Sequence, residues 1–153
     1  MKESEEHKKL KEEAIKWLHQ IGCWLFSIEV ADSYLGRADA CGIKKNGDIY
    51  FIEAKATQKD LESKKQKYFN YKLNHHKPAN FYYLILPEEG VEPNHEWNDW
   101  GIIKVIFREG AEILPKVVRE AKRFEADETW KKELYETLAR SACLRAFKEI
   151  LFA

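Results

Sequence analysis

Residues 36–56 read GRADACGIKKNGDIYFIEAKA, and this stretch decides the fold. Two segments suited to β-strands flank Lys45-Asn46-Gly47-Asp48, and such a turn sequence between two strands is typical of a β-hairpin. The second segment is the apolar run Ile49-Tyr50-Phe51-Ile52, which ends in Glu53-Ala54-Lys55. The stretch therefore predicts a hairpin whose second strand carries a carboxylate and an ammonium group at its end.

The length of the hairpin loop decides which side chains share a face. A two-residue loop sets Asp39 opposite residue 54, on the wrong face for a contact with Glu53. A three-residue loop pairs residue 44 with residue 48 and sets Asp39 opposite Glu53, and such loops favour a left-handed residue where Gly47 stands. We expect the three-residue loop. Because alternate residues of a strand share a face, Asp39, Glu53 and Lys55 then converge on one patch of the sheet.

The segments outside the hairpin predict a mixed sheet with helices packed on it. Residues 4–21 have the apolar spacing of an amphipathic helix, with Ser4 as the expected N-cap. The order of elements predicts one α/β domain over 1–153, with about five strands in a core at about 4–108 and C-terminal helices at about 115–152. The other expected elements are strands at 23–30, 80–86 and 101–107, a lysine-rich helix at 58–74, a short helix from Pro115 to about Phe124, and a last helix from about Asp127 to Phe152.

Length and composition exclude several classes of protein. The chain has 153 residues, no net charge and three cysteines. No run of about 18 apolar residues occurs, so we expect no membrane span, and the charged N-terminus is unlike a secretory signal. We therefore expect a cytoplasmic protein with reduced, buried thiols. Zero net charge argues against a uniformly basic surface but leaves room for a local basic face.

Two carboxylates beside one ammonium group suit a hard divalent cation. Mg²⁺ usually takes one or two protein carboxylates, together with water and substrate phosphate oxygens. We expect Asp39, Glu53 and the backbone carbonyl of Ala54 to hold it, where it polarises a phosphate and activates a water. Lys55 then holds or deprotonates that water, or stabilises charge on the phosphate. The alternative for Glu-x-Lys in so charged a chain is an ordinary surface ion pair.

The arrangement of Asp39 and Glu53-Ala54-Lys55 resembles the PD-(D/E)XK, or restriction-endonuclease-like, nuclease superfamily, and within it the MmcB-like DNA-repair branch. The resemblance covers roughly residues 7–145 and implies a restriction-endonuclease-like core and phosphodiester hydrolysis with Mg²⁺ or Mn²⁺. The Pro that the family places before the Asp is replaced by Ala38. Further matching elements are Glu29, Gly36-Arg37-Ala38-Asp39, Gly47, Ile52, a Lys/Tyr-bearing helix, Phe81-Tyr82-Tyr83 and Trp100-Gly101.

Four further residues are candidates for the border of the site or for an additional ligand. The resemblance suggests that Glu29 borders it beside Arg37, and the alternative is that these two residues only form an ion pair. Nucleases of this type often draw a carboxylate from the first helix, for which Glu12 and Glu13 are candidates, with Glu13 as the expected additional metal ligand. The alternative for both is a solvated helical face.

The helix expected at 58–74 is the most basic stretch of the chain and is the candidate DNA-binding element. Its lysines suit contacts with phosphates beside the metal site. The alternative is a basic surface helix whose tyrosines are part of the core. The candidate DNA-binding residues are Lys59, Lys64, Gln66, Lys67, Tyr68 and Tyr71.

These observations favour a Mg²⁺- or Mn²⁺-dependent deoxyribonuclease that acts in DNA repair, recombination or phage defence. The alternative is a module with the same fold that binds nucleic acid without cutting it. Glycoside hydrolysis by the two carboxylates is a third hypothesis, but Lys55 and the lack of an aromatic sugar platform count against it. The expected partners are DNA and either a second copy of the chain or a larger repair complex, with no membrane.

Overall fold

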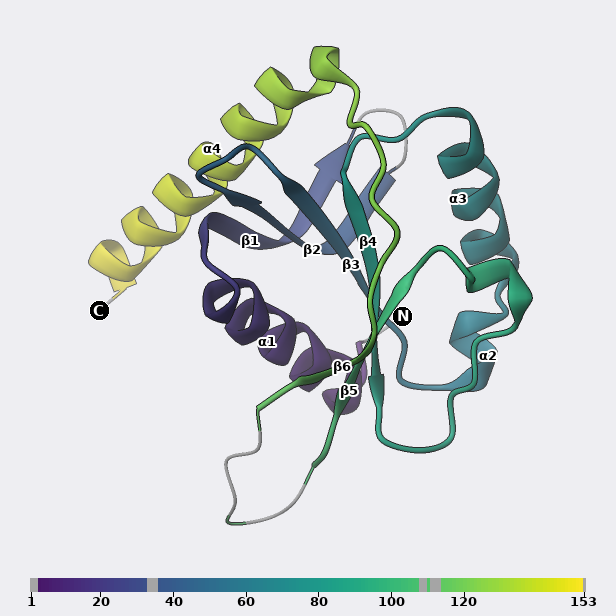
Figure 1. Ribbon diagram of the computed structural model, residues 1–153. Helices are drawn as coiled ribbons and strands as arrows, with labels where there is room; N and C mark the ends of the chain where they lie inside the picture. The colour runs from purple at the N-terminus through teal and green to yellow at the C-terminus, as the bar shows by residue number, and fades with distance from the viewer. Residues whose placement is uncertain (1–2, 33–35, 108–109, 111–113, 153) are drawn as a thin grey trace.

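The protein is a six-stranded mixed sheet with helices on both faces. The computed structural model describes residues 3–32, 36–107, 110 and 114–152, with the backbone alone at 31–32, 36–37 and 152 (Figure 1). The described helices are α1 (Glu5–Gln20), α2 (Gln58–Leu61), α3 (Lys64–His75), the short 3-10 helix η1 (His95–Trp97) and α4 (Glu128–Phe152). The strands, which lie in the sheet in chain order, are β1 (Cys23–Asp32), β2 (Gly36–Lys44), β3 (Ile49–Ala54), β4 (Phe81–Pro87), β5 (Gly101–Val105) and β6 (Lys116–Arg119).

The α/β class and the mixed sheet are confirmed. Strands β1, β2 and β3 form an antiparallel meander, β3, β4 and β5 are parallel neighbours, and β6 returns antiparallel to β5. The parallel pairing follows from the crossover through α2 and α3 between β3 and β4. All residues of β3 are buried, which agrees with its continuous apolar sequence and with cover on both faces.

Two separate apolar layers hold the helices to the sheet. Helix α1 begins after Ser4, whose side chain accepts a hydrogen bond from the His7 amide at 3.2 Å, so the expected N-cap is confirmed. Its apolar face packs with β3, β4 and β5 side chains such as Ile52 and Ile103. Helices α3 and α4 pack on the opposite face through residues that include Phe69 and Leu138.

The hairpin has the three-residue loop that the sequence predicts. The Lys44 amide donates to the Asp48 carbonyl at 3.0 Å, and the ladder continues with Ile43 opposite Ile49. Gly47 has a φ of 95°, in the left-handed region that side chains disfavour. This loop fixes the register that decides which residues of β2 lie beside the end of β3.

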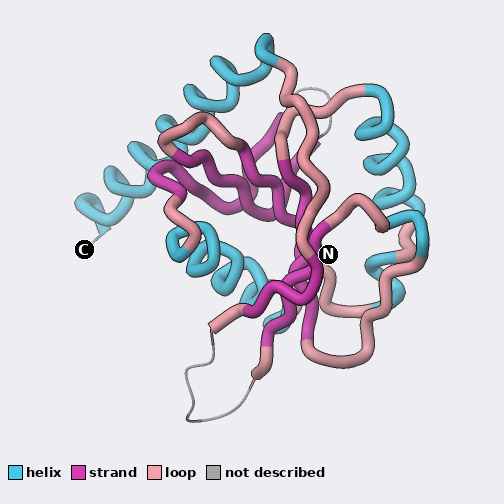
Figure 2. The backbone as a smooth tube through the Cα atoms, in the orientation of Figure 1, coloured by secondary structure: helices cyan, strands magenta, loops and turns pink. Residues whose placement is uncertain are grey.

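The expectation of a short helix from Pro115 to Phe124 is wrong. Residues Lys116–Arg119 form β6, whose residue Val117 lies opposite Ile103. Residues 120–127 then run as a loop to α4 (Figure 2). The backbone amides of this loop donate outside their own segment, as Phe124 does to the Asn80 carbonyl at 2.8 Å, so they are not available to a helix. The sheet consequently has six strands instead of the five expected. The described C-terminal region contains one helix, α4, where two were expected.

Two smaller expectations also need correction. The helix expected at 58–74 is two helices, because Ser63 starts a new one by accepting a hydrogen bond from the Gln66 amide at 3.1 Å. Of the three cysteines, Cys23 and Cys41 are buried free thiols as expected, whereas Cys143 is exposed on α4. Among the described residues, no helix is long and apolar enough to cross a membrane.

Replacing Gly47 with Ala should lower the free energy of unfolding by about 1–2 kcal/mol, because an L-residue is strained in the left-handed conformation. Urea unfolding of the two proteins measures this difference. Lys45→Ala, an exposed change in the same loop, is the control and should lie within about 0.5 kcal/mol of wild type. Equal stability of the Gly47 variant and the control would contradict the argument.

Candidate functional site

The site lies where β2 and β3 stop pairing. The described ladder between these strands ends at Ala40 opposite Ile52. Beyond it, the Ala54 amide donates a 2.8 Å hydrogen bond to Oδ2 of Asp39, so a side-chain carboxylate takes the place of a strand carbonyl. The strands therefore part at this point, and the carboxylates of Asp39 and Glu53 lie in the opening between them.

Asp39 is held as an anion by its surroundings. Its side chain is 18% exposed, and its Oδ2 atom lies 3.6 Å from Nε2 of His7 on α1. Burial by itself raises the pKa of Asp39, but the contact with His7, the hydrogen bond from Ala54 and the charge of Lys55 outweigh it and hold the pKa below its ordinary value. Asp39 is therefore an ionised carboxylate at neutral pH.

Glu53 has the opposite electrostatics. The residue is only 6% exposed, and its Oε1 atom is buried with no hydrogen-bond partner among the described residues. Burial, followed by the charge of Asp39, raises the pKa of Glu53 well above its ordinary value, while the charge of Lys55 lowers it. Such a carboxyl group is costly to ionise unless a cation occupies the space beside it.

Lys55 completes the group that the hairpin brings together. It follows Glu53 by two positions, and its charge lowers the pKa of both Asp39 and Glu53. Its backbone amide donates to the Ile85 carbonyl at 3.2 Å, so the residue stays tied to the neighbouring strand β4 just past the end of β3. The charge of Lys55 thus favours the ionised form of two acids, of which Asp39 has a lowered pKa and Glu53 a raised one.

The first turns of α1 supply residues that sequence reasoning missed. His7 contacts both Asp39 and Glu3, the latter at 2.9 Å. Lys11, one turn later, is buried at 4% exposure and forms ion pairs with Glu3 at 2.7 Å and Glu29 at 2.8 Å. The spacing of residues 7 and 11 places them on one helix face, but only the packing of α1 on the sheet shows that this face meets Asp39.

Glu29, the expected border residue, lies on β1 next to β2. It falls between two paired positions of β1 and β2, so it stands in the same row of the sheet as Asp39. Its φ of 54° marks a local distortion of β1, and its side chain pairs with Lys11. The side chain of Arg37, the expected neighbour of Glu29, lies outside the described residues.

Glu13 is not brought to the two carboxylates by any contact in the described part of the chain. Its Oε1 atom accepts a hydrogen bond from Lys16 at 2.9 Å, and its Oε2 atom is buried without a described partner. Within residues 3–152, apart from the gaps, no group of three or more His, Cys, Asp or Glu side chains is arranged to hold a metal ion. His7, rather than Glu13, is the α1 residue that contacts Asp39.

Two carboxylates still fit the needs of one magnesium ion. Mg²⁺ retains several waters and commonly takes one or two protein carboxylates, with substrate phosphate completing the shell. The buried Oε1 atom of Glu53 accepts no hydrogen bond from a described residue, so it is available as an oxygen ligand for a cation. The donor set of Asp39 and Glu53 is therefore compatible with a hard divalent ion.

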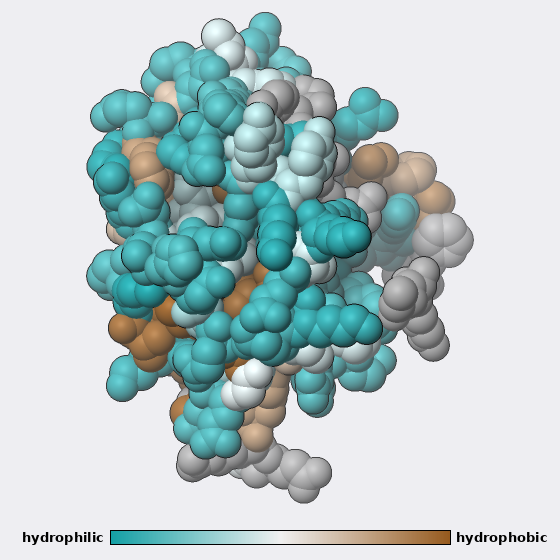
Figure 3. All heavy atoms as spheres, turned by 90° about the vertical axis from the view of Figure 1, so that its right-hand side faces the viewer, coloured by the Kyte–Doolittle hydropathy of each residue, from teal (hydrophilic) through white to brown (hydrophobic). Residues whose placement is uncertain are grey.

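The candidate DNA-binding residues are arranged along an exposed helix. Tyr68 and Tyr71 are 61% and 60% exposed, so the alternative in which these tyrosines are part of the core is wrong. Helix α3 contains no acidic residue, and its residues Lys64, Lys65 and Lys67 are exposed. The side of the molecule on which α3 lies is predominantly hydrophilic (Figure 3). Lys59 on α2 is also exposed. Gln66, by contrast, is buried, and its amide donates to Asn70 at 3.0 Å.

Comparison with known proteins establishes similarity of fold alone. No protein-family profile and no curated protein sequence matches the chain. A protein of unknown function from Silicibacter pomeroyi has a similar structure, with a TM-score of 0.74 and 18% identity over 99% of this chain and 97% of that one. The structure of Pyrococcus furiosus SfsA in complex with Ca²⁺ is a weaker match, with a TM-score of 0.43 and 13% identity over 75% of this chain and 64% of that one.

Replacing Glu53 with Gln should stabilise the metal-free protein at neutral pH by about 1–3 kcal/mol, because it removes a buried carboxyl group that is costly to ionise and whose Oε1 atom has no hydrogen-bond partner among the described residues. The folded-state pKa of Glu53 lies above the ordinary value of 4.5, so the acid adds stability below pH 4.5 and loses it as the pH rises through the folded-state pKa. The stability gain of the variant should therefore be absent below pH 4.5 and grow above it.

Urea unfolding in chelator at a series of pH values measures this gain. Glu89→Gln, which removes an exposed acid, is the control and should follow the wild-type curve. A Glu53 variant whose stability differs from wild type by the same amount at every pH would show that the carboxyl group is not shifted in the way described.

Proposed function

We propose that this protein is a metal-dependent nuclease of the PD-(D/E)XK type, with Asp39, Glu53 and Lys55 as its catalytic centre. The observation that carries the proposal is the buried, unsatisfied Oε1 atom of Glu53 beside the ionised carboxylate of Asp39. One of these two acids is ionised and the other is buried with a raised pKa. This arrangement fits the binding of a divalent ion better than an ordinary surface ion pair, in which both charged groups would be solvated.

The residues divide the work of phosphodiester hydrolysis. Asp39 and Glu53 would hold Mg²⁺ or Mn²⁺, which supplies polarisation of the phosphate and a water of lowered pKa. The Ala54 amide points toward β2, and in a strand the carbonyl of the same residue points the same way, which supports the Ala54 carbonyl as a further ligand. His7 acts as a positioning residue, because its contact orients the carboxylate of Asp39.

Lys55 is the group that acts on the substrate. Its ammonium group stabilises negative charge that grows on the phosphate in the transition state, or it orients the attacking water. The ionised Asp39 carboxylate raises the pKa of Glu53, and the charge of Lys55 in turn lowers it toward the anion that binds a metal. The proton affinity of Glu53 therefore depends on the charges of both Asp39 and Lys55.

DNA is the proposed substrate because of α3. The helix carries Lys64, Lys65, Lys67 and Lys72 and no acid, and it follows α2, the helix that begins three positions after Lys55. Although the whole chain has no net charge, this helix supplies a local positive surface. Such a surface contacts phosphates whatever the base sequence.

A second candidate function is a module that binds nucleic acid without cutting it. The observation that favours it is that, among the described residues, no group of three or more His, Cys, Asp or Glu side chains is arranged to hold a metal ion. The basic helix would then act alone. The two functions differ in whether divalent metal binding leads to cleavage.

Asp39→Asn, Glu53→Gln and Lys55→Ala should each lower cleavage of DNA at least about a hundredfold, because each removes a charge that the reaction needs. The measurement is the cleavage of supercoiled, linear and single-stranded DNA with Mg²⁺ or Mn²⁺. Calorimetric titration with Mn²⁺ should show that the Asp39 and Glu53 variants no longer bind the ion, whereas Lys55→Ala retains it.

Glu13→Gln and Glu89→Gln are the matched controls and should cut at the wild-type rate. Loss of cleavage in Glu13→Gln equal to that in Glu53→Gln would place Glu13 in the site after all. A wild type that binds Mn²⁺ and DNA but cuts none of the three substrates would favour the non-cleaving module. Cleavage by all three site variants at the wild-type rate would refute the assignment of the centre.

Replacing both Lys64 and Lys67 with Gln should weaken binding of duplex DNA and reduce its dependence on salt. For each phosphate that the variant no longer neutralises, the slope of log K against log salt should fall in magnitude by about 0.9. Fluorescence anisotropy over a range of NaCl concentrations, in chelator, measures the slope. Lys148→Gln, which removes an exposed charge at the far end of α4, is the control, and an unchanged slope in the double variant would argue against the α3 surface.

A further inference from the structure

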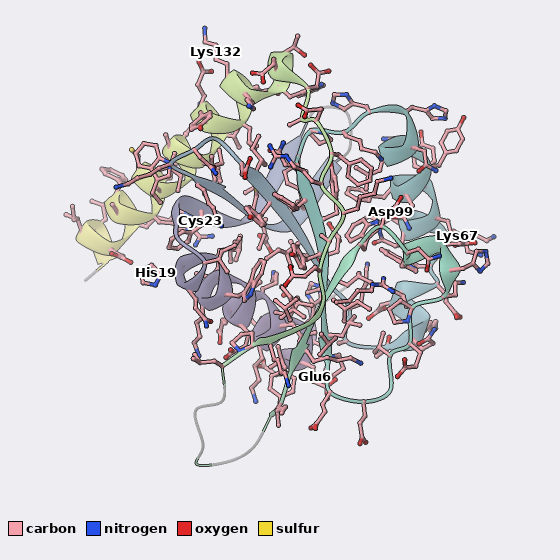
Figure 4. All side chains as sticks on the ribbon, in the orientation of Figure 1. Glu6, His19, Cys23, Lys67, Asp99 and Lys132 are labelled. Carbon is pink, nitrogen blue, oxygen red and sulfur yellow. The ribbon has the colours of Figure 1, made fainter. Side chains whose placement is uncertain are left out.

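A cleft opens between α3 and the segments that pack beside it, away from the paired carboxylates. Its volume is about 420 Å³, and one wall is formed by Lys67, Asn70, Tyr71 and Asn74 of α3. The other wall includes Trp100 and Phe124. Figure 4 shows Lys67 of α3 and Asp99, which also lines the cleft, on the same side of the sheet. We call this space the α3 cleft.

The lining of the α3 cleft combines aromatic rings with side-chain amides. Tyr71 is 60% exposed, so its ring is accessible from the cleft. The exposed Asn74 amide makes no hydrogen bond to any described residue. Asn70 accepts a hydrogen bond from Gln66 through Oδ1. A flat ligand ring can stack on the aromatic side chains, while hydrogen-bond donors and acceptors on its edge bond to the side-chain amides.

A second hollow adjoins the α3 cleft. Its volume is about 260 Å³, it shares Lys67, Asn70 and Glu96 with the α3 cleft, and it extends to Gln58, the first residue of α2. A strand whose base occupied the α3 cleft would therefore have Lys67 beside its backbone where it leaves the cleft toward α2.

We propose that the α3 cleft binds an unpaired nucleobase, with Tyr71 stacking on the ring and Asn74 bonding to its edge. Aromatic stacking and amide contacts are the means by which proteins hold single-stranded bases. The charged lining of the cleft is balanced, with Lys67 and Lys77 against Glu96 and Asp99, so the cleft is not built for a phosphate alone. A paired base in a duplex cannot enter a recess between two walls without leaving its stack.

This inference rests on the proposed function only for the statement that the ligand is nucleic acid. It adds that the substrate presents unpaired bases, as a single strand, a flap or an opened duplex does. Lys67 would contact the phosphate beside the bound base, because it lines both the cleft and the hollow that adjoins it.

The test compares a short single-stranded DNA with an abasic strand of the same length and charge. Anisotropy titrations in chelator give the affinity of the wild type and of variants for both strands, without any cleavage. Tyr71→Ala should weaken binding of the base-containing strand roughly 5- to 150-fold, the range for one stacked base, and leave the abasic strand unchanged. Asn74→Ala should weaken the base-containing strand to a smaller extent, and Tyr71→Phe should retain wild-type affinity.

Tyr68→Ala is the matched control. Tyr68 is on the same helix and equally exposed, at 61%, but it does not line the α3 cleft. It should leave the preference for bases unchanged. Equal weakening in Tyr68→Ala and Tyr71→Ala, or a wild type that binds the abasic strand as tightly as the normal one, would overturn the proposal.

The outcome separates this inference from the proposed nuclease function. A base preference that depends on Tyr71 in a protein that never cuts DNA would support the α3 cleft and refute the nuclease. Cleavage that depends on Asp39, in a protein whose Tyr71→Ala variant binds both strands like the wild type, would support the nuclease and refute the base-binding cleft.

Discussion

The hydrogen bond from the Ala54 amide to the carboxylate of Asp39 joins the fold to the candidate site. It forms at the point where the β2–β3 ladder ends, and it satisfies an amide that would otherwise lack its strand partner. The same bond fixes one carboxylate next to the end of β3, which carries the other. The rest of the site depends on this geometry, because Glu53 and Lys55 have fixed positions relative to Ala54 in the same strand.

Electrostatic imbalance is the second constraint. Asp39 receives a backbone hydrogen bond and lies near His7, whereas Glu53 is buried with one oxygen unsatisfied. Placing two like charges in one opening favours a shared proton or a shared cation. The pairs that Lys11 forms with Glu3 and Glu29 hold the first turns of α1 against this side of the sheet. Glu53, an acid that is costly to ionise, is thus retained next to elements that ion pairs hold in place, an arrangement common at functional sites.

The two faces of the sheet carry different tasks. On the α1 face, His7 contacts Asp39 and Lys11 pairs with Glu3 and Glu29, while the opposite face supports α3 through buried Phe69 and Leu73. With these apolar residues in the core, α3 presents its lysines and both tyrosines outward. The basic helix and the paired acids are consequently close in sequence but lie in different environments, the lysines exposed and the acids largely buried.

The sequence by itself determined the local structure. The Asn-Gly turn and the alternation of β2 and β3 predicted the three-residue loop and the placing of Asp39 beside Glu53, because turn chemistry and strand periodicity are local properties. Tertiary structure alone decided that Lys116–Arg119 form a sixth strand beside β5. A short segment with β-branched residues forms an edge strand only where a partner strand is available. Tertiary structure also decided that His7 reaches Asp39 and that Tyr71 faces a cleft, because these contacts join elements whose relative placement is set by the packing of the whole core.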